Sequence, residues 1–426
     1  MPDQHELDPE VIRQRTIRHR TAHARLVVLD DQGKPLPGAD VTVRQTGHKF
    51  LFGCNAYVLF SAGDEQLEQG YRRRFIDVLN YATLPFYWSS YEGQQGTTRA
   101  AALAQMALWC REHHVATKGH PLAWHECFPA WMAGKSLEEV EALQMARIAR
   151  EVQGFAGRID RWDVINESVA TPRHQPPNPF VELCGRLGRT ELIRRVFQQA
   201  RQANPQATLV LNDFDVTPEC ENLLRQCLDA GVDFDVIGIQ SHMHVGYWGP
   251  AKAWDVCSRF ARFGKPLHFT EATLLSGPLK TDSDWHGRHP GWDTTPEGEA
   301  RQAHEVEEFY RVLFSHPAVE AITWWDLSDH QAWQGAPAGL VRKDMSPKPA
   351  YEALMRLVKG EWWTAPTTLR TDAAGRAEFH GFLGPYAAEA AGRRARFRLD
   401  RAGEQTVTLR MTKDGPEESV NAGDPP

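Results

Sequence analysis

The hydrophobic positions of this chain fall into short runs separated by amphipathic stretches. Eight runs rich in β-branched, aromatic and leucine residues have the length of buried strands. They lie at residues 51–55, 80–83, 115–119, 160–166, 207–212, 235–239, 266–270 and 321–325. Helical periodicity is found between them, at residues 137–153, 189–203, 218–230 and 295–315. Eight strands that alternate with helices predict the α/β class and, within it, a (β/α)8 TIM barrel.

The two ends of the chain show a different pattern. Alternating residues at 24–29 and 39–44 predict two strands, which we interpret as a hairpin around the turn-rich segment 30–38. Further alternating runs lie at residues 367–371, 376–379, 395–399 and 406–410. Because a hairpin alone is barely stable, we expect strands from both termini to form a small accessory β-sandwich. The predicted organisation is an N-terminal arm (1–23), the sandwich (24–48 plus 364–412), the barrel (49–363) and a disordered tail (413–426).

Composition limits the class of protein. The length of 426 residues exceeds the usual size of a TIM barrel, which agrees with a small second domain. Hydrophobic residues make up 42% of the chain, enough for a full core and against general disorder. The net charge of −7 gives no reason to expect a nucleic-acid partner. Because no apolar stretch approaches the length of a bilayer span, we expect no membrane partner either.

Cysteine usage and the N-terminal residues bear on the compartment. The seven cysteines are odd in number and lack CxxC spacing, which argues against a zinc ribbon and a complete disulfide framework. Residues 1–6 lack the apolar core of a secretory signal. We therefore expect a cytoplasmic protein, or a secreted or periplasmic one from which a signal has been removed. The oligomeric state stays open.

Two glutamates end two of the predicted strands. Glu167 ends the run 162–167, and Glu271 ends the run 266–271. Catalytic groups of barrel enzymes lie at the C-terminal ends of the strands. One glutamate there could simply cap the following helix. A facing pair is the minimum equipment for glycoside hydrolysis, so the pair favours a glycosidase.

Polar and aromatic residues follow other predicted strands as well. These clusters are Gly119-His120 with Trp124-His125, Asn212-Asp213-Phe214, Gly238-Ile239-Gln240-Ser241-His242 and Thr323-Trp324-Trp325-Asp326. Sugar hydroxyls that lose their water need hydrogen-bond partners, and the faces of tryptophan rings pack against sugar rings. The 14 tryptophans of the chain agree with a carbohydrate cleft.

With these motifs in this order, residues 50–360 resemble glycoside hydrolase family 10, the xylanase family. The segments Phe269-Thr270-Glu271 and 323–329 with Trp333, and then 347–351, match it too. The resemblance implies a retaining β-glycosidase with Glu271 as nucleophile, Glu167 as general acid/base, a carbohydrate substrate and no cofactor or metal. The substrate-binding residues it implies are Asn166, His120, Trp124, Gln240, His242, Trp325, Trp333, Tyr87, Cys127 and Phe214.

Three positions depart from the family pattern. Leu84 stands where members of the family carry Asn, Tyr87 stands in place of Lys, and Cys127 stands in place of Gln. A site that loses hydrogen-bonding groups discriminates against the sugar that used them. We therefore expect changed glycone specificity. The insert 276–292 could be a wall that shortens the cleft or an ordinary surface loop.

Three alternatives remain open. The first is a true endo-β-1,4-xylanase acting on xylan or xylooligosaccharides. The second, of another class, is a non-catalytic carbohydrate-binding protein. The third is a metal-dependent barrel hydrolase using His242 and His244, for which the remaining strand-end ligands do not line up well.

Overall fold

The computed structural model describes residues 4–413, which form two compact units. One unit consists of residues 52–306 and 318–351. The other unit is built from the segments up to residue 51, at 307–317 and from residue 352 onward. The predicted tail lies outside the described residues apart from Lys413. The domain limits drawn from the sequence stay a prediction.

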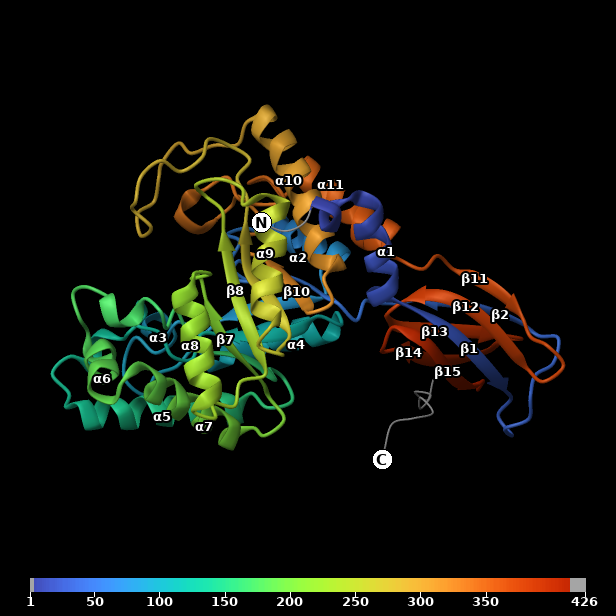
Figure 1. Ribbon diagram of the computed structural model, residues 1–426, viewed down its shortest axis with the longest axis horizontal. Helices are drawn as coiled ribbons and strands as arrows, with labels where there is room; N and C mark the ends of the chain where they lie inside the picture. The colour runs from blue at the N-terminus through green and yellow to red at the C-terminus, as the bar shows by residue number, and fades with distance from the viewer. Residues whose placement is uncertain (1–3, 414–426) are drawn as a thin grey trace. The chain divides into compact units, whose positions relative to one another are not determined.

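A closed barrel of eight parallel strands forms the centre of the first unit, in the order β10-β3-β4-β5-β6-β7-β8-β9 (Figure 1). The strands are β3 (Leu51–Asn55), β4 (Tyr81–Pro85), β5 (Ala116–His120), β6 (Arg161–Asn166), β7 (Thr208–Asp213), β8 (Val236–His242), β9 (Leu267–Thr273) and β10 (Val319–Trp324). Because neighbouring strands follow one another in sequence and pair in parallel, the predicted TIM barrel is confirmed.

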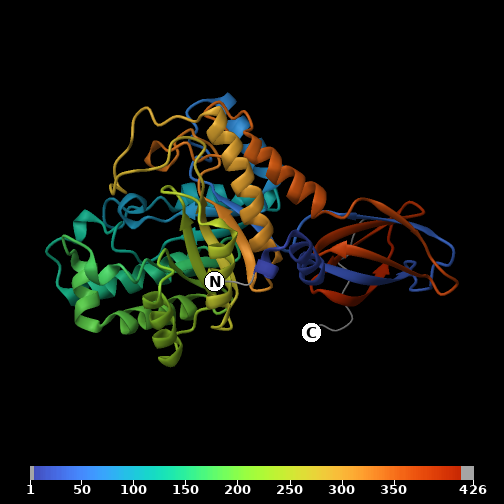
Figure 2. The ribbon, with the colours of Figure 1, turned by 45° about the horizontal axis from the view of Figure 1, so that its top comes forward.

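Helices follow the strands and lie on the outside of the barrel (Figures 1 and 2). Within this unit they are α2 (Glu65–Val78), α3 (Trp88–Tyr91), α4 (Ala100–Glu112), α5 (Leu137–Gly154), α6 (Pro179–Leu187), α7 (Arg189–Ala203), α8 (Pro218–Asp229) and α9 (Gly249–Ala261). The helices α10 (Pro296–Ser315) and α11 (Pro349–Arg356) each begin in this unit and end in the other. The sequence marks several helix starts. At α5, for example, Ser136 and Glu139 form a capping box that satisfies two free backbone N–H groups.

Two strand glycines make room for groups that line the barrel. A Cβ atom at Gly119 in β5 would overlap the Trp162 ring, which is fully buried. A Cβ atom at Gly238 in β8 would come within 2.5 Å of the Asn212 side-chain oxygen. The missing side chain at Gly238 therefore lets Asn212 occupy its place at the end of β7.

The second unit holds the accessory β-sandwich, which both ends of the chain build. Its sheets have the orders β12-β1-β15 and β11-β2-β13-β14 (Figure 1). The elements are the 3-10 helix η1 (Gln4–Leu7), α1 (Pro9–Arg20), β1 (Thr21–Leu29), β2 (Asp40–Gln45), β11 (Thr367–Arg370), β12 (Arg376–Phe382), β13 (Gly384–Ala390), β14 (Arg393–Leu399) and β15 (Gly403–Arg410). Alternate residues of these strands are buried, as in β12, apart from the exposed strand β11, so each sheet contributes one face to a shared core.

The predicted N-terminal hairpin is wrong. β1 and β2 belong to different sheets, although each forms near its predicted position. β1 pairs with β12 in antiparallel and with β15 in parallel orientation, while β2 pairs with β11 and β13. The alternation in each run specified a half-buried strand, but the C-terminal strands determine its partner.

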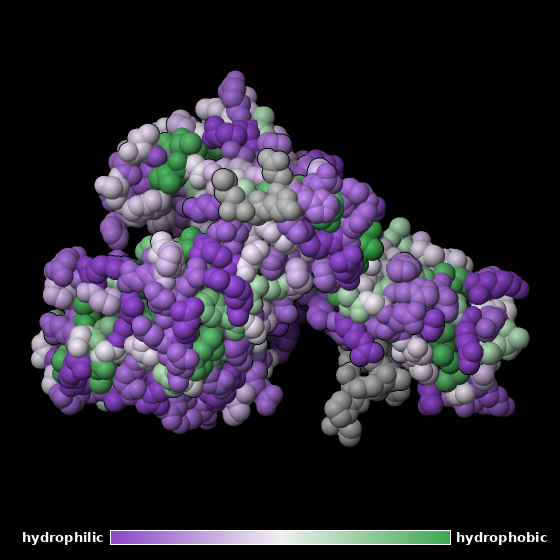
Figure 3. Space-filling model, viewed as in Figure 1, coloured by the Kyte–Doolittle hydropathy of each residue, from purple (hydrophilic) through white to green (hydrophobic). Residues whose placement is uncertain are grey.

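Surface features agree with the composition. On the face drawn in Figure 3, hydrophobic residues form small separate groups among hydrophilic ones, as is usual for protein surfaces. All seven cysteines are free thiols; six are buried and Cys127 is partly exposed. Within residues 4–413, the length and apolar character needed to cross a bilayer do not occur together in any helix.

Candidate active site

Both glutamates lie at the C-terminal end of the barrel strands. Glu167 directly follows β6, and Glu271 lies inside β9, which continues for two residues beyond it. The register between β8 and β9 shifts next to this site, because Ile239 pairs with Phe269 but Gln240 pairs with Glu271. Such a bulge changes the direction of the side chains that follow it. Glu167 itself has a φ of 56°, a left-handed backbone conformation that is uncommon for a non-glycine residue.

Two hydrogen bonds hold the carboxylate of Glu271, which is 4% exposed. Asn212 Nδ2 donates to Glu271 Oε1 at 2.7 Å, and His242 Nε2 lies 3.1 Å from Glu271 Oε2. His242 Nδ1 lies 3.0 Å from the Thr273 hydroxyl. An ionised Glu271 only accepts hydrogen bonds, so Nε2 is the donor and the threonine hydroxyl can donate to Nδ1. Thr273 thereby orients the imidazole.

Three donors surround the carboxyl group of Glu167. Trp124 Nε1 donates to Oε2 at 3.1 Å, while Asn166 Nδ2 and Gln240 Nε2 each donate to Oε1 at 3.2 Å. Asn166 Oδ1 accepts from Gln240 Nε2 at 3.1 Å and from Asn212 Nδ2 at 2.8 Å. A short chain of amides therefore connects the two glutamates and fixes their relative placement.

Asn212 is the link in this chain, and the sequence motif did not assign it a role. Its Nδ2 contacts both Asn166 and Glu271, and its Oδ1 accepts from the Thr270 hydroxyl at 2.5 Å. Because the Thr270 hydroxyl occupies Oδ1, the amide orientation that presents Nδ2 to both partners is fixed. Its position in the Asn212-Asp213-Phe214 motif at a strand end was the signal that could have identified it.

The surroundings shift the pKa values of the two glutamates in opposite directions. Burial, followed by the charge of Glu271, raises the pKa of Glu167 from 4.5 to about 8. Burial would also raise the pKa of Glu271, but the interaction with His120 and the hydrogen bond with His242 outweigh it and lower that pKa. Near neutral pH, one carboxyl group is therefore protonated and its partner is ionised, the division that an acid and a nucleophile need.

A buried ion pair lies below this site. Lys118 Nζ and His120 Nδ1 lie 2.6 and 2.7 Å from the same oxygen of Asp163, and all three side chains are fully enclosed. Although burial raises the pKa of Asp163, the Lys118 charge and the His120 hydrogen bond give a net lowering. The ionised Asp163 fixes the His120 ring from below, a role that the sequence motif did not suggest.

Aromatic rings line the same mouth. His242 contacts the rings of Trp325 and Trp333, with ring centres 5.6 and 4.7 Å apart. His120 contacts Trp325 at 5.6 Å and Tyr87 at 5.4 Å. The structure thus brings together most of the residues predicted for substrate contact: Asn166, His120, Trp124, Gln240, His242, Trp325, Trp333 and Tyr87.

The position occupied by Tyr87 is part of an aromatic pair. The Tyr57 hydroxyl donates to the Tyr87 hydroxyl at 3.2 Å, and their rings meet edge to face at 5.6 Å. Tyr57 also packs against Trp325 at 5.6 Å, and Tyr87 against Trp124 at 5.7 Å. Burial raises the pKa of both phenols well above 10, so they stay neutral. Sequence reasoning missed Tyr57, because the segment after β3 carries no pattern that singles it out.

Three other predicted positions differ in their surroundings. Leu84 is fully buried within β4. Cys127 is partly exposed, and burial raises its pKa to about 12, so its thiol is neutral. Phe214 is 48% exposed just after β7, and its contact with substrate stays a prediction.

The insert 276–292 packs against the aromatic part of the site. The Trp285 ring stacks on Trp333 at 6.1 Å with an angle of 24° between the ring planes, and Gln334 Nε2 donates to the Trp285 carbonyl at 2.8 Å. His244 lies edge-on to both tryptophan rings, at 5.6 and 5.2 Å. His244 therefore belongs to this aromatic cluster, while His242 bonds with Glu271.

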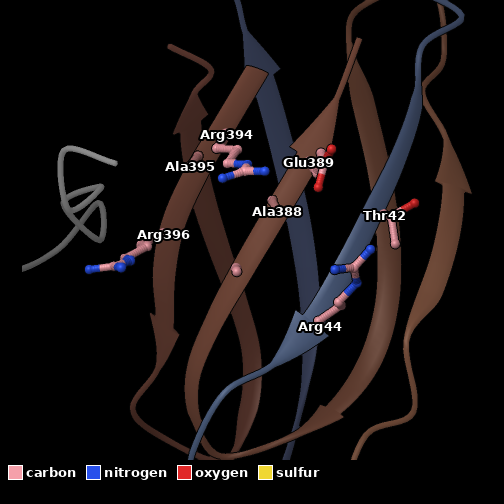
Figure 4. A pocket seen from close by; sticks show the side chains of 8 residues that line it. Thr42, Arg44, Ala388, Glu389, Arg394, Ala395 and Arg396 are labelled. Atoms are coloured by element: carbon pink, nitrogen blue, oxygen red, sulfur yellow. The ribbon is translucent and has the colours of Figure 1, made fainter. Parts of the chain in front are cut away.

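A shallow hollow on the sandwich has different chemistry (Figure 4). In the pairing of β2, β13 and β14, Ala387 lies between Arg44 and Arg396, and Glu389 lies between Thr42 and Arg394. The short Ala387 side chain between two arginines accounts for the depression. Its lining has one carboxylate and no aromatic ring, so it lacks the features that define the barrel site.

A closed (β/α)8 barrel with two differently charged glutamates at the strand ends is the architecture of a glycoside hydrolase. Residues 80–357 match the model of glycosyl hydrolase family 10. The chain therefore belongs to this family, and the resemblance drawn from its motifs is confirmed.

Individual relatives are distant. An endo-1,4-beta-xylanase/feruloyl esterase of Xylanibacter ruminicola is 26% identical over 273 residues, which cover 57% of this chain and 36% of the relative. The anti-sigma-I factor RsgI6 of Acetivibrio thermocellus is 26% identical over 382 residues, covering 86% of this chain and 44% of the relative. The match thus spans less than half of either relative. Xylanase 10B of Thermotoga petrophila, solved with xylobiose, shares the fold with a TM-score of 0.63 at 22% identity over 74% of this chain and 95% of that one.

Proposed function

We propose that this chain is a retaining β-glycosidase that hydrolyses β-linked oligo- or polysaccharides and has a glycone site unlike that of typical xylanases. The observation that carries the proposal is the pair of connected carboxyl groups with opposite pKa changes, Glu167 raised and Glu271 lowered. A retaining mechanism needs a proton donor on one side of the glycosidic bond and a charged nucleophile on the other.

The reaction follows from these two states. Glu271 Oε attacks the anomeric carbon while Glu167 gives its proton to the leaving oxygen, and the glycosidic bond breaks. The ester that forms removes the negative charge of Glu271, which is a cause of the high pKa of Glu167. Glu167, now ionised, takes a proton from water as the water oxygen attacks the anomeric carbon. Glu271 leaves as a carboxylate, and both groups return to their first state.

The proposed change in glycone specificity rests on the Tyr57–Tyr87 pair. In typical members of the family, a lysine takes the position of Tyr87 and can donate three hydrogen bonds. Here the Tyr87 hydroxyl accepts from Tyr57, and its ring packs against His120 and Trp124. A neutral aromatic surface at this place favours a sugar that presents an apolar group, or fewer hydroxyl groups, to Tyr87. The Trp285–Trp333 stack is consistent with an added wall beside it.

Hydrolysis of a panel of aryl β-glycosides, with xylan alongside, tests this proposal. The panel holds the xyloside, xylobioside, glucoside, cellobioside and galactoside. We expect turnover of a glycoside other than the xylobioside, and loss of turnover in Glu271→Ala. Efficient turnover of xylobioside and xylan would contradict the changed glycone site and leave an endo-β-1,4-xylanase.

Two variants of Tyr87 separate the effect of its aromatic ring on specificity from the effect of a hydrogen-bond donor at this position. Tyr87→Lys restores a donor and should raise kcat/KM for the xylobioside by at least about tenfold. Tyr87→Phe removes only the hydroxyl and should leave that value near the wild-type level. Equal values for both variants would show that Tyr87 does not decide specificity.

A carbohydrate-binding regulator is the second candidate. The observation that favours it is the relative named an anti-sigma-I factor, which aligns over 86% of this chain. Such a protein would bind oligosaccharides without turnover. Binding by wild type with no hydrolysis of any panel member would favour this candidate over the glycosidase.

A further inference from the structure

Two histidines and a glutamate meet beside the site, on the two loops next to Glu167. His125 and Glu126 lie in the loop after β5, and His174 follows the short 3-10 helix η3 (Thr171–Arg173) after β6. Glu126 Oε1 lies 3.2 Å from His174 Nδ1 and 3.6 Å from His125 Nε2. One ligand atom from each of the three residues lies within 4.8 Å of the others.

The hydrogen bonds around His125 define which nitrogen faces the cluster. The Thr171 hydroxyl lies 2.9 Å from His125 Nδ1 and donates to the Glu167 carbonyl oxygen at 3.1 Å. A hydroxyl has one proton, so when it donates to the carbonyl it accepts from Nδ1–H. His125 Nε2 then carries a lone pair, and that lone pair is directed toward a carboxylate oxygen. His125 Nε2 and Glu126 Oε1 are then two acceptors that face each other at 3.6 Å, and a cation placed between them would interact favourably with both.

The spacing suits a transition-metal ion. With bonds of about 2.0–2.1 Å at tetrahedral angles, the ligand atoms of zinc lie about 3.3–3.4 Å apart. The distances of 3.2 and 3.6 Å from Glu126 bracket this value. The Thr171 contact to the non-coordinating nitrogen is the arrangement that orients histidine ligands in metal sites. The Glu126 and His174 side chains are 26% and 19% exposed, which gives an ion a path from solvent.

We propose that His125, Glu126 and His174 bind Zn²⁺ through two imidazoles and one carboxylate, with a position left for water. This ion is separate from the carboxyl pair that carries the proposed hydrolysis. It would join the loop of Trp124, which donates to Glu167, to the segment of Thr171, which bonds the Glu167 main chain. The ion would therefore act as a clamp on both sides of Glu167, and it takes no part in bond cleavage.

The experiment titrates Zn²⁺ into the full chain after removal of metals with a chelator, and measures stoichiometry and Kd by calorimetry and bound metal by mass spectrometry. Wild type should bind about one Zn²⁺ per chain, with a rise in Tm. Glu126→Gln and His174→Ala should each abolish this binding or weaken it at least about tenfold. The control is His304→Ala, since His304 is an exposed histidine of α10 outside the cluster.

Thr171→Val tests the orientation of His125 separately, because it removes the hydroxyl and keeps the shape. It should weaken Zn²⁺ binding about 10- to 100-fold. The proposal is overturned if wild type takes up no zinc, or if Glu126→Gln and His174→Ala bind it as well as His304→Ala does. Glu126→Gln keeps the size of the side chain and its ability to form hydrogen bonds, and it removes only the negative charge. This variant therefore decides the result if His174→Ala does not fold. Zinc uptake is measured without substrate, so the result does not depend on the proposed glycosidase activity.

Discussion

Neutralising Glu271 should make Glu167 a stronger acid. Burial is the largest cause of the rise in the Glu167 pKa from 4.5 to about 8, and the charge of Glu271 is the next. The variant Glu271→Gln removes that charge and keeps the size of the side chain. The amide oxygen can still accept from Asn212 Nδ2, and the amide NH2 group can donate to His242 Nε2 once that imidazole carries its proton on Nδ1, toward Thr273. The burial of Glu167 should therefore stay nearly unchanged.

Coulomb repulsion determines how far the Glu271 charge shifts the Glu167 pKa. A retaining mechanism places the carboxyl groups about 5–5.5 Å apart, and at an effective dielectric constant of about 20 two charges at that distance repel by about 3 kcal/mol. This energy corresponds to about 2 in pKa. Because burial contributes more than the Glu271 charge, we expect the Glu167 pKa in Glu271→Gln to fall by about 1 to 2 and to stay above the ordinary value.

The assay is a ¹³C NMR titration of protein labelled at the glutamate carboxyl carbons, with Glu167→Gln used to assign the Glu167 signal. The Glu167 signal should titrate near pH 8 in wild type and at a clearly lower pH in Glu271→Gln. An unchanged Glu167 pKa in Glu271→Gln would show that the two groups do not interact. A fall to the ordinary glutamate value would show that charge, rather than burial, dominates.

Two further predictions concern stability. Lys118→Met leaves the charge of the buried Asp163 without its main partner, so it should lower the free energy of unfolding by about 3–5 kcal/mol in urea denaturation. A loss below about 1 kcal/mol would show that this ion pair is not needed for stability. Gly119→Ala places a Cβ atom on the Trp162 ring and should cost about 1–3 kcal/mol, whereas Gly154→Ala at the end of α5 meets open space and should be neutral or stabilising in the same assay. Equal free energies of unfolding for the two glycine variants would contradict the packing described for β5.

The barrel was predictable because its signal is local. The eight strands lie close to the runs of apolar residues, and the exceptions are informative. β8 runs to His242 and β9 to Thr273, beyond the predicted ends at 239 and 270. The polar residues that form the site, Gln240 and Glu271 among them, continue these strands, so the hydrophobic pattern ends before the strand does.

What the sequence could not supply depends on contacts between distant segments. Asn212 at the end of β7 bonds Glu271, and Thr270 holds its amide in place, only because β7 and β9 come close at the barrel mouth. Tyr57 reaches Tyr87 from another loop, and no periodicity announces it. The two strands of the expected N-terminal hairpin likewise found partners more than 300 residues away.

During turnover we expect Glu271 to form a covalent glycosyl-enzyme intermediate. An aryl 2-deoxy-2-fluoro-β-glycoside of the sugar that the panel identifies would trap it, because the fluorine destabilises the cationic transition state of both steps while the aryl group still leaves. The measurement is the intact mass of the protein followed by peptide mapping. We expect one added glycosyl group, located on Glu271 and absent in Glu271→Ala. Label on another residue, or turnover of the parent glycoside without any trapped adduct, would show that Glu271 is not the nucleophile.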